Sequence, residues 1–178
     1  MADHRDRLPP LTLVLGGARS GKSAYAESLL SAAQERLYIA TAQAQDAEMN
    51  ERIRIHQTRR GQNWQTVEEP LDLVAALLAH VRPDRPALVD CLTLWLTNLL
   101  LGHAAVDQEI DRLLLALPDI AGPVVFVANE VGLGIVPDNA LARQFRDHAG
   151  RLNQHLAARC QRVVFVAAGL PLLLKDTR

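Results

Sequence analysis

The stretch "GGARSGKSAYAE", residues 16–27, directly follows the apolar run "LTLVL" of residues 11–15. The pattern G-x-x-x-x-G-K-[ST] is matched by Gly16, Gly21, Lys22 and Ser23, with a predicted strand before it and a helix-compatible segment after it. In such a segment the glycines let backbone N–H groups surround phosphate oxygens, and the start of the helix adds positive potential. The stretch therefore predicts a strand, a phosphate-binding loop and a helix.

The predicted ligand of this loop is a nucleoside triphosphate with Mg²⁺. Lys22 is expected to reach the β- and γ-phosphates, and the hydroxyl of Ser23 is expected to bind Mg²⁺. A second group on the magnesium side is expected at the end of a neighbouring apolar strand, where Asp90 ends "ALVD". The alternative for Asp90 is a helix cap or a turn carboxylate. The loop residues expected to bind the nucleotide are Gly16, Gly17, Ala18, Arg19, Ser20, Gly21, Lys22 and Ser23.

Short β-rich runs alternate with longer segments of helical patterning along the whole chain. The predicted strands are residues 11–16, 36–42, 87–93, 123–129 and 162–168. The predicted helices are residues 22–34, 45–60, 70–80, 94–117 with a break near Gly102, and 139–158. This alternation indicates an α/β fold with a mainly parallel sheet, helices on both faces and ligands at the carboxyl ends of the strands. We expect one nucleotide-binding domain over residues 10–178 after a loose tail at residues 1–9.

The composition is that of an ordinary globular protein. Of the 178 residues 49% are hydrophobic and 22% are charged, and the formal net charge is -1. This charge provides no general attraction to nucleic acid or anionic membranes, which favours small-molecule partners. Cys91 and Cys160 each lie in an apolar run, which fits a reducing compartment rather than a disulfide framework or a zinc site. Without a signal-peptide pattern or a membrane-spanning run, the expected location is the cytoplasm.

The segment "DAEMNERIRIHQTRR", residues 46–60, places one histidine among arginines. Helical spacing puts Arg52 and Arg60 four residues from His56, and Arg59 three residues away. Nearby positive charge disfavours the imidazolium form, so a neutral ring nitrogen is available as a nucleophile, and the arginines can neutralise a triphosphate. Taken alone, however, a helical histidine of this kind is more often a surface or packing residue.

Several sequence blocks occur in a fixed order from Leu11 to Lys175. They are "GGARSGKS", "YIATAQAQDAEMNERIRIHQTRR", "WQTVEEP", "DCLTLWLTNLL", "NEVGLGIVP" and "LARQFRDHAGRLNQ". Together these blocks closely resemble the bifunctional adenosylcobinamide kinase / adenosylcobinamide-phosphate guanylyltransferase family of cobalamin biosynthesis. The resemblance implies a RecA-like α/β fold and a homotrimer with the nucleotide near a subunit boundary.

The resemblance also implies two reactions on one corrinoid. In the first, the γ-phosphoryl group of ATP or GTP moves to the hydroxyl of the aminopropanol arm of adenosylcobinamide. In the second, a histidine attacks the α-phosphorus of GTP, releases pyrophosphate and carries GMP as a phosphoramidate until the corrinoid phosphate takes it, which gives adenosylcobinamide-GDP.

The family's guanylylated histidine falls on His56. Some relatives have two adjacent histidines where this chain has Ile55 and His56, so only His56 is a candidate here. The family's guanine-nucleotide contacts fall on Ala40, Thr41, Ala42, Gln57, Thr58, Arg59, Arg60, Glu68 and Asp90. The carboxylate of Glu68 can accept hydrogen bonds from guanine N1–H and N2–H₂, although an acidic loop residue beside Glu69 explains it equally.

Three weaker patterns have competing interpretations. Asn129 and Glu130 follow a predicted strand and are candidates to orient the acceptor, but a plain strand-to-helix turn accounts for them too. Asp147 lies four residues from both Arg143 and Arg151, which favours an internal ion-pair network over phosphate contacts. Trp64 and Trp95 are interpreted as packing residues.

Two other functions use the same motifs. A simple small-molecule kinase would use only the phosphate-binding loop and would leave His56 without a role. A nucleotide-dependent switch would bind the triphosphate and change its partners without modifying a metabolite. These alternatives differ from the two-step enzyme in whether the protein carries a covalent nucleotide.

Overall fold

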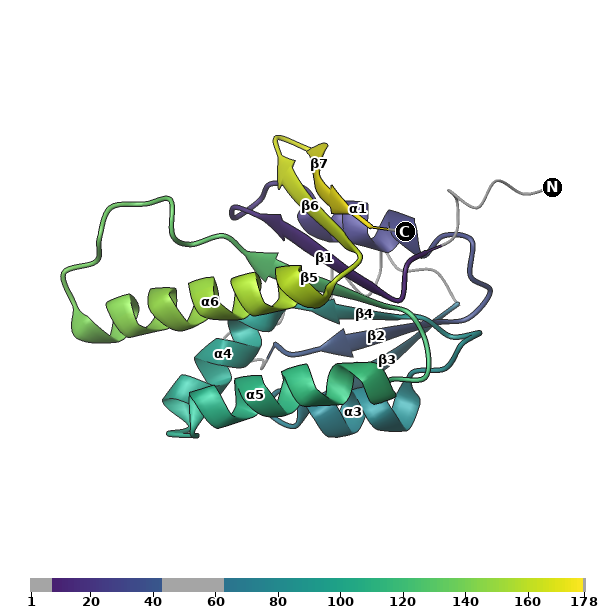
Figure 1. The fold of residues 1–178 in the computed structure, drawn as a ribbon, viewed down its shortest axis with the longest axis horizontal. Coiled ribbons are helices and arrows are strands. Elements are labelled where there is room, and N and C mark those ends of the chain that lie inside the picture. The colour runs from purple at the N-terminus through teal and green to yellow at the C-terminus, as the bar shows by residue number, and fades with distance from the viewer. Residues whose placement is uncertain (1–7, 43–62, 178) are drawn as a thin grey trace.

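The computed structural model describes residues 8–42 and 63–177, and a seven-stranded sheet forms its centre (Figure 1). The strands are β1 (Leu11–Gly16), β2 (Arg36–Ala40), β3 (Trp64–Glu68), β4 (Ala87–Asp90), β5 (Val124–Asn129), β6 (Arg162–Ala167) and β7 (Leu170–Asp176). The helices are α1 (Lys22–Leu29), α3 (Leu73–His80), α4 (Leu92–Leu101), α5 (Val106–Ala116) and α6 (Ala140–Arg159), with a short 3₁₀ helix at Leu117–Asp119.

The sheet is parallel except at one edge, which confirms the predicted α/β fold. Its strand order is β3-β2-β4-β5-β1-β6-β7, and among these described strands only the β6–β7 pair is antiparallel. The strands β3 and β7 were not predicted from the sequence. Both are edge strands with mainly half-buried or exposed residues, so they lack the continuous apolar run of a central strand.

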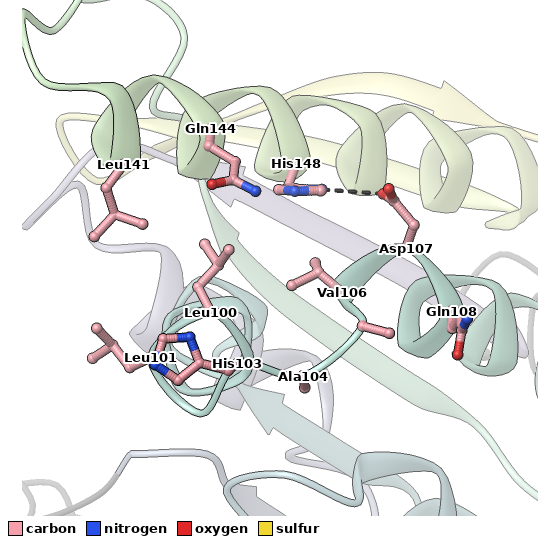
Figure 2. A pocket seen from close by; sticks show the side chains of 11 residues that line it. Leu100, Leu101, His103, Ala104, Val106, Asp107, Gln108, Leu141, Gln144 and His148 are labelled. Atoms are coloured by element: carbon pink, nitrogen blue, oxygen red, sulfur yellow. Dashed lines mark ion pairs between the residues drawn. The ribbon is translucent and has the colours of Figure 1, made fainter.

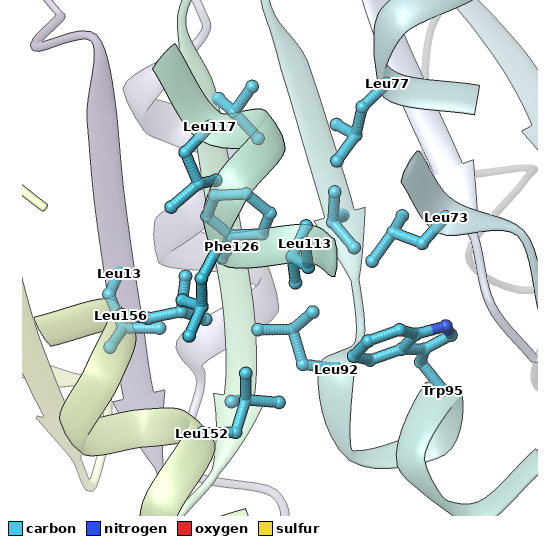
Figure 3. Close-up of a cluster of buried hydrophobic side chains, with 14 of the residues drawn as sticks. Leu13, Leu73, Leu77, Leu92, Trp95, Leu113, Leu117, Phe126, Leu152 and Leu156 are labelled. Atoms are coloured by element: carbon cyan, nitrogen blue, oxygen red, sulfur yellow. The ribbon is translucent and has the colours of Figure 1, made fainter. Parts of the chain in front are cut away.

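Two hydrophobic clusters fill the two faces of the sheet. Side chains alternate along each strand, so Phe126 of β5 belongs to the larger cluster and its neighbours Val125 and Val127 belong to the smaller one. The larger cluster packs against α3, α4, α5 and α6 (Figure 3), and the smaller one packs against α1. Trp95 is fully buried in the larger cluster and its Nε1 donates to Leu71 O at 2.9 Å, as expected for a packing residue.

Several predicted boundaries move. The predicted strand 87–93 ends at Asp90, because Cys91 is the extended N-cap residue of α4. The predicted helix 94–117 is interrupted at Gly102, as expected, and continues as α5. The predicted helix 45–60 lies outside the described residues. Of the predicted tail, Pro9 is buried and Leu8 packs against the smaller cluster.

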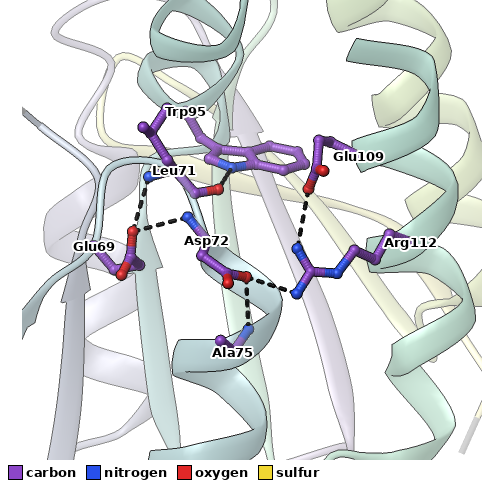
Figure 4. A network of polar contacts seen from close by, with 7 residues as sticks. All are labelled: Glu69, Leu71, Asp72, Ala75, Trp95, Glu109 and Arg112. Atoms are coloured by element: carbon purple, nitrogen blue, oxygen red, sulfur yellow. Dashed lines mark hydrogen bonds and ion pairs between the residues drawn. The ribbon is translucent and has the colours of Figure 1, made fainter. Parts of the chain in front are cut away.

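The helix α3 begins three residues later than predicted because an acidic pair organises its entry (Figure 4). Asp72 accepts from Ala75 N–H at 3.1 Å and forms an ion pair with Arg112 at 2.9 Å. Glu69 Oε1 accepts from the N–H groups of Leu71 and Asp72 at 3.0 and 2.8 Å. Glu69 is therefore a structural residue of this turn. Within residues 8–42 and 63–177, none of the helices combines the length and apolar character that a membrane crossing needs.

Candidate functional site

The segment between β1 and α1 has the conformation expected of a phosphate-binding loop. Gly21 precedes α1 with a φ of 92°, and Lys22 begins the helix. Although it is charged, Lys22 is only 9% exposed, and its Nζ donates to Gly17 O at 3.0 Å. The ammonium group is thus folded back over the loop, beside the backbone that would surround a phosphate.

Two positions of the loop require glycine because neighbouring atoms lie too close to the backbone for a Cβ. A Cβ on Gly16 would lie 2.5 Å from both Ser20 Oγ and Val166 O. Gly21 has left-handed backbone geometry, and a Cβ there would lie 3.1 Å from the Cα of Gly169. Gly169 N–H also donates to Ser20 O at 2.8 Å, so the β6–β7 turn supports the loop from outside.

The predicted nucleotide residues of the described part share the carboxyl edge of the sheet. Ala40 pairs in register with both Glu68 and Asp90, and Thr41 and Ala42 follow β2 directly. The structure therefore brings the ends of β2, β3 and β4 to the same edge as the loop after β1. The other predicted residues, His56, Gln57, Thr58, Arg59 and Arg60, lie outside the described residues.

Asp90 ends β4 on this edge, but β4 is not the strand next to β1, which leads into the loop. The strand β5 lies between β4 and β1. The hydroxyl of Tyr38 donates to Asp90 Oδ2 at 2.9 Å, and the Tyr38 ring packs edge-on against Trp64 with centroids 6.1 Å apart. Asp90 does not cap α4, because the N-cap residue is Cys91 and no side-chain cap hydrogen bond forms there. Its carboxylate is instead oriented from β2.

A buried polar network fixes the ends of β2 and β4. Thr41 Oγ1 donates to Cys91 O at 2.8 Å and accepts from Cys91 N–H at 2.9 Å, while Asn98 Nδ2 donates to Thr41 O at 2.8 Å. Thr41 N–H donates to Asp90 O at 3.2 Å, so each polar group of Thr41 has a partner within the protein. Burial, with the negative charge of Asp90, raises the pKa of the Cys91 thiol to about 11. The Cys91 thiol is therefore neutral at ordinary pH.

Glu68 and Glu130 lie on the same edge with different surroundings. Glu68 ends the edge strand β3 and is exposed, so its carboxylate is accessible to a ligand. Glu130 is tied to the turn after β5: its N–H donates to Gly16 O at 3.1 Å, and its Oε1 accepts from Gly132 N–H. The sequence did not identify Tyr38 as a site residue, although its two-residue spacing from Ala40 places both on one face of β2.

The predicted ion-pair network on α6 forms only in part, because Asp147 pairs with Arg146 at 3.5 Å and no described ion pair joins it to Arg143 or Arg151. Arg143 donates to the carbonyls of Pro137 and Asp138 at 2.9 and 2.7 Å, so it fixes the turn that precedes α6. Arg151 lies 3.8 Å from Asp107 of α5 rather than beside Asp147. Tertiary partners in the preceding turn and on α5 override the local spacing of four residues.

A pocket of about 650 Å³ lies between the α4–α5 connection and α6 (Figure 2). Its lining combines leucines of α4 and α6 with the buried His148, whose Nδ1 is 3.1 Å from Asp107 Oδ1. Among the described residues, none of those predicted to bind the nucleotide lines this pocket.

Solved structures similar to this one show the fold. A protein from Pyrococcus horikoshii OT3 superposes with a TM-score of 0.58 and 9% identity, covering 97% of this chain and 89% of that chain. A prototypical ATPase of the type III secretion system of pathogenic bacteria superposes with a TM-score of 0.59 and 8% identity, covering 96% of this chain and 57% of that chain. These similarities agree with the expected α/β fold with a mainly parallel sheet.

Sequence comparison identifies the family of this chain as well as its fold. The "Bifunctional adenosylcobalamin biosynthesis protein CobP" of Pseudomonas aeruginosa is 52% identical over 92% of this chain and 96% of its own length. The "Bifunctional adenosylcobalamin biosynthesis protein CobU" of Salmonella typhimurium is 43% identical over 93% of this chain and 99% of its own length. A family profile described as "Cobinamide kinase / cobinamide phosphate guanyltransferase" matches residues 12–174. The chain therefore belongs to the cobinamide kinase / cobinamide phosphate guanyltransferase family.

Proposed function

We propose that this protein phosphorylates adenosylcobinamide with ATP or GTP and then transfers GMP from GTP to the product, through a guanylyl-histidine at His56. The observation that carries the proposal is the loop of residues 16–23, closed by Lys22 at the carboxyl edge that also holds Asp90. Membership of the family supplies the corrinoid substrate and the order of the two reactions.

In the kinase step the loop would hold the triphosphate, and two nearby oxygen donors would hold its Mg²⁺ ion. Ser23 and Asp90 offer a hydroxyl and a carboxylate, which are the hard oxygen ligands that Mg²⁺ prefers. Asp90 Oδ2 is held by Tyr38, and no residue of the described part is hydrogen-bonded to Oδ1. Bound Mg²⁺ would neutralise charge on the β- and γ-phosphates. Lys22 and the loop N–H groups then hold the phosphates while the acceptor hydroxyl approaches.

In the guanylyl step we assign the nucleophile to His56 and phosphate neutralisation to Arg59 and Arg60. The exposed carboxylate of Glu68 is our candidate for guanine recognition, because it can accept from both N1–H and N2–H₂. A neutral imidazole nitrogen attacks the α-phosphorus, and pyrophosphate leaves with the electron pair of the broken bond. The corrinoid phosphate then takes the GMP and frees the histidine.

The test is covalent labelling with Mg²⁺ and GTP that carries label on either the α- or the γ-phosphorus. Acid-labile label from α-labelled GTP alone, lost in His56→Ala and kept in the exposed control His155→Ala, is the expected result. If His56→Ala keeps the α-label, the assignment of His56 is refuted. If no α-label forms while adenosylcobinamide phosphate is still made, the protein is a simple kinase. If neither product forms, a nucleotide-dependent switch is favoured.

We also propose a cytoplasmic homotrimer. The segment between β5 and α6 projects away from the sheet (Figure 1) and exposes Leu133, Ile135 and Val136, with Ile135 97% exposed. The edge strand β7 exposes four more leucines. Exposed apolar side chains on segments such as these can serve as contact surfaces. Light scattering should give three times the 19.6 kDa chain mass, and a monomer would refute the assembly.

A further inference from the structure

The hairpin formed by β6 and β7 contacts the phosphate-binding loop at both of its ends. Gly16, where the loop begins, pairs in register with Val166 of β6, and a Cβ on Gly16 would lie 2.5 Å from Val166 O. At the other end, a Cβ on Gly21 would lie 3.1 Å from the Cα of Gly169. The backbone of the hairpin is therefore packed directly against the backbone of the loop.

The turn of this hairpin has one defined backbone conformation. It consists of Ala168 and Gly169, between the paired residues Ala167 and Leu170, and its two φ angles are 51° and 79°. Positive φ at both positions is typical of the two-residue turns that match the twist of a hairpin. A Cβ on Gly169 would meet no described atom within 4 Å, so conformation rather than space favours glycine there. The N–H of Gly169 is thus held in a fixed direction.

That N–H group sets the direction of a peptide unit in the loop. It donates to Ser20 O at 2.8 Å. The peptide unit between Ser20 and Gly21 is planar and trans, so its C=O and N–H point in opposite directions. Because the Ser20 carbonyl points to the turn, the Gly21 N–H points away from the turn and across the loop.

The Gly21 N–H is available to a ligand. Among the described residues, none accepts a hydrogen bond from it. It directly precedes Lys22 and Ser23, which begin α1 and whose N–H groups have no partner within the helix. The bond from Gly169 therefore aims one more donor from the same end of α1, where the helix dipole favours a bound phosphate.

We propose that Gly169 is a positioning residue for the phosphate-binding loop, whose N–H holds the Ser20 carbonyl and thereby aims the Gly21 N–H at the phosphates of the bound nucleotide. Gly169 acts only through the loop. Without this bond the peptide unit between Ser20 and Gly21 adopts other directions, and the fraction of the protein that is ready to bind phosphate decreases. The inference rests on the proposed function, because it assumes that this loop binds the triphosphate.

The sharpest test removes the Gly169 N–H and changes no side chain. Cys160 allows a thioester of residues 1–159 to be joined to a synthetic peptide of residues 160–178, which gives the full chain with glycolic acid in place of Gly169. This ester has an oxygen atom where the amide has its N–H. The matched control carries lactic acid in place of Ala168, whose N–H donates to no described backbone group. An all-amide chain, ligated and refolded in the same way, is the reference.

The measured quantity is the affinity for ADP or GDP with Mg²⁺, whichever the wild type binds more tightly. We expect the Gly169 ester to bind roughly threefold to tenfold more weakly than the reference, which corresponds to the loss of one hydrogen bond. The Ala168 ester should bind as the reference does. A purely structural role would lower the unfolding midpoint of the nucleotide-free protein and leave this affinity unchanged. An affinity of the Gly169 ester within about twofold of both the reference and the control would overturn the proposal.

Two expressed variants make the same comparison without ligation. Asn adopts a positive φ more readily than other residues with a side chain, whereas a β-branched residue is strained there. Gly169→Val should therefore weaken nucleotide binding, and Gly169→Asn should retain most of it. Equal affinities of both variants and the wild type would contradict the positioning role.

Nucleotide binding and phosphorylation of adenosylcobinamide are separate measurements, so this proposal and the proposed function can fail separately. Weaker binding by the Gly169 ester, in a protein that never phosphorylates adenosylcobinamide, would support the positioning role and refute the function. Unchanged binding in an active kinase would refute the positioning role alone. A wild type that binds neither ADP nor GDP would refute both.

Discussion

Replacing Tyr38 by Phe removes one hydroxyl group and leaves the ring in place. That hydroxyl donates to Asp90 Oδ2 at 2.9 Å, and Tyr38 as a whole is 5% exposed. Hydrogen bonds to charged groups contribute about 1.5–3 kcal/mol, but Asp90 is only half-buried, so water replaces part of the interaction. We take about 1 kcal/mol as the loss of stability, which lowers the Tm by about 2–4 °C in a chain of this size.

The larger effect is expected on Mg²⁺. Residues that orient a metal ligand typically change metal affinity or activity by about 10–100-fold when they are replaced. For Tyr38→Phe we expect the Mg²⁺ concentration at half-maximal kinase rate to rise by at least about tenfold, with the rate largely recovered at saturating Mg²⁺. The same shift should appear in Mg²⁺-dependent binding of a fluorescent triphosphate, which does not require turnover.

The matched control is Tyr25→Phe, which changes the chain's other tyrosine, a half-buried residue of α1. This control should leave the Mg²⁺ requirement unchanged. An Mg²⁺ midpoint for Tyr38→Phe within twofold of both the wild type and the control would refute the role of Tyr38 in orienting Asp90. It would also weaken the assignment of Asp90 to the metal.

Three further changes probe the framework around the site. Gly122→Ala should destabilise the fold by about 1–3 kcal/mol in urea unfolding, because the new Cβ would lie 2.0 Å from Arg82 O. Nucleotide affinity should not change. An unchanged unfolding midpoint would refute this prediction. Burial raises the pKa of the Cys160 thiol from 9.0 to about 12. The neutral thiol therefore contributes fully to the free energy of unfolding below pH 9, and this contribution is lost as the pH rises towards 12. In Cys160→Ala the free energy of unfolding should decrease less over this pH range. Asp72→Ala should lower the free energy of unfolding by about 1–2 kcal/mol, because the cap on α3 is lost. Asp72→Asn should retain most of this stability, since an amide oxygen can also cap the helix. Equal losses in thermal unfolding would indicate that the half-exposed ion pair with Arg112 matters more than the cap.

The parts of the fold that the sequence predicts are those governed by local pattern and burial. The central strands are continuous apolar runs, and the glycine pattern places the loop between β1 and α1. The edge strands escape prediction for a physical reason. The residues of β3 are half-buried or exposed, and β7 is held by pairing with β6, a contact that no local pattern encodes.

The site residues also divide into those that local sequence predicts and those that depend on long-range contacts. Lys22 and Asp90 are recognisable from their positions at the start of a helix and the end of a strand. The contact between Tyr38 and Asp90 joins residues 52 positions apart, and the pairing of Asn129 with Gly16 depends on strand order and register. Sequence spacing on α6 is misleading for Arg143, because the carbonyls of a preceding turn are better placed than Asp147.

The position of β1 in the sheet has a consequence for how the protein is made. Among the strands that the structure describes, β1 comes earliest in the chain, yet both strands that flank it, β5 and β6, begin only at Val124 and Arg162. The nascent β1 therefore has no hydrogen-bonding neighbours until most of the chain has been synthesised, and closure of this long-range pairing is slow. The turn that supports Ser20 comes later still, at Gly169. We therefore expect bound nucleotide to stabilise the fold only after β5 and β6 have paired with β1.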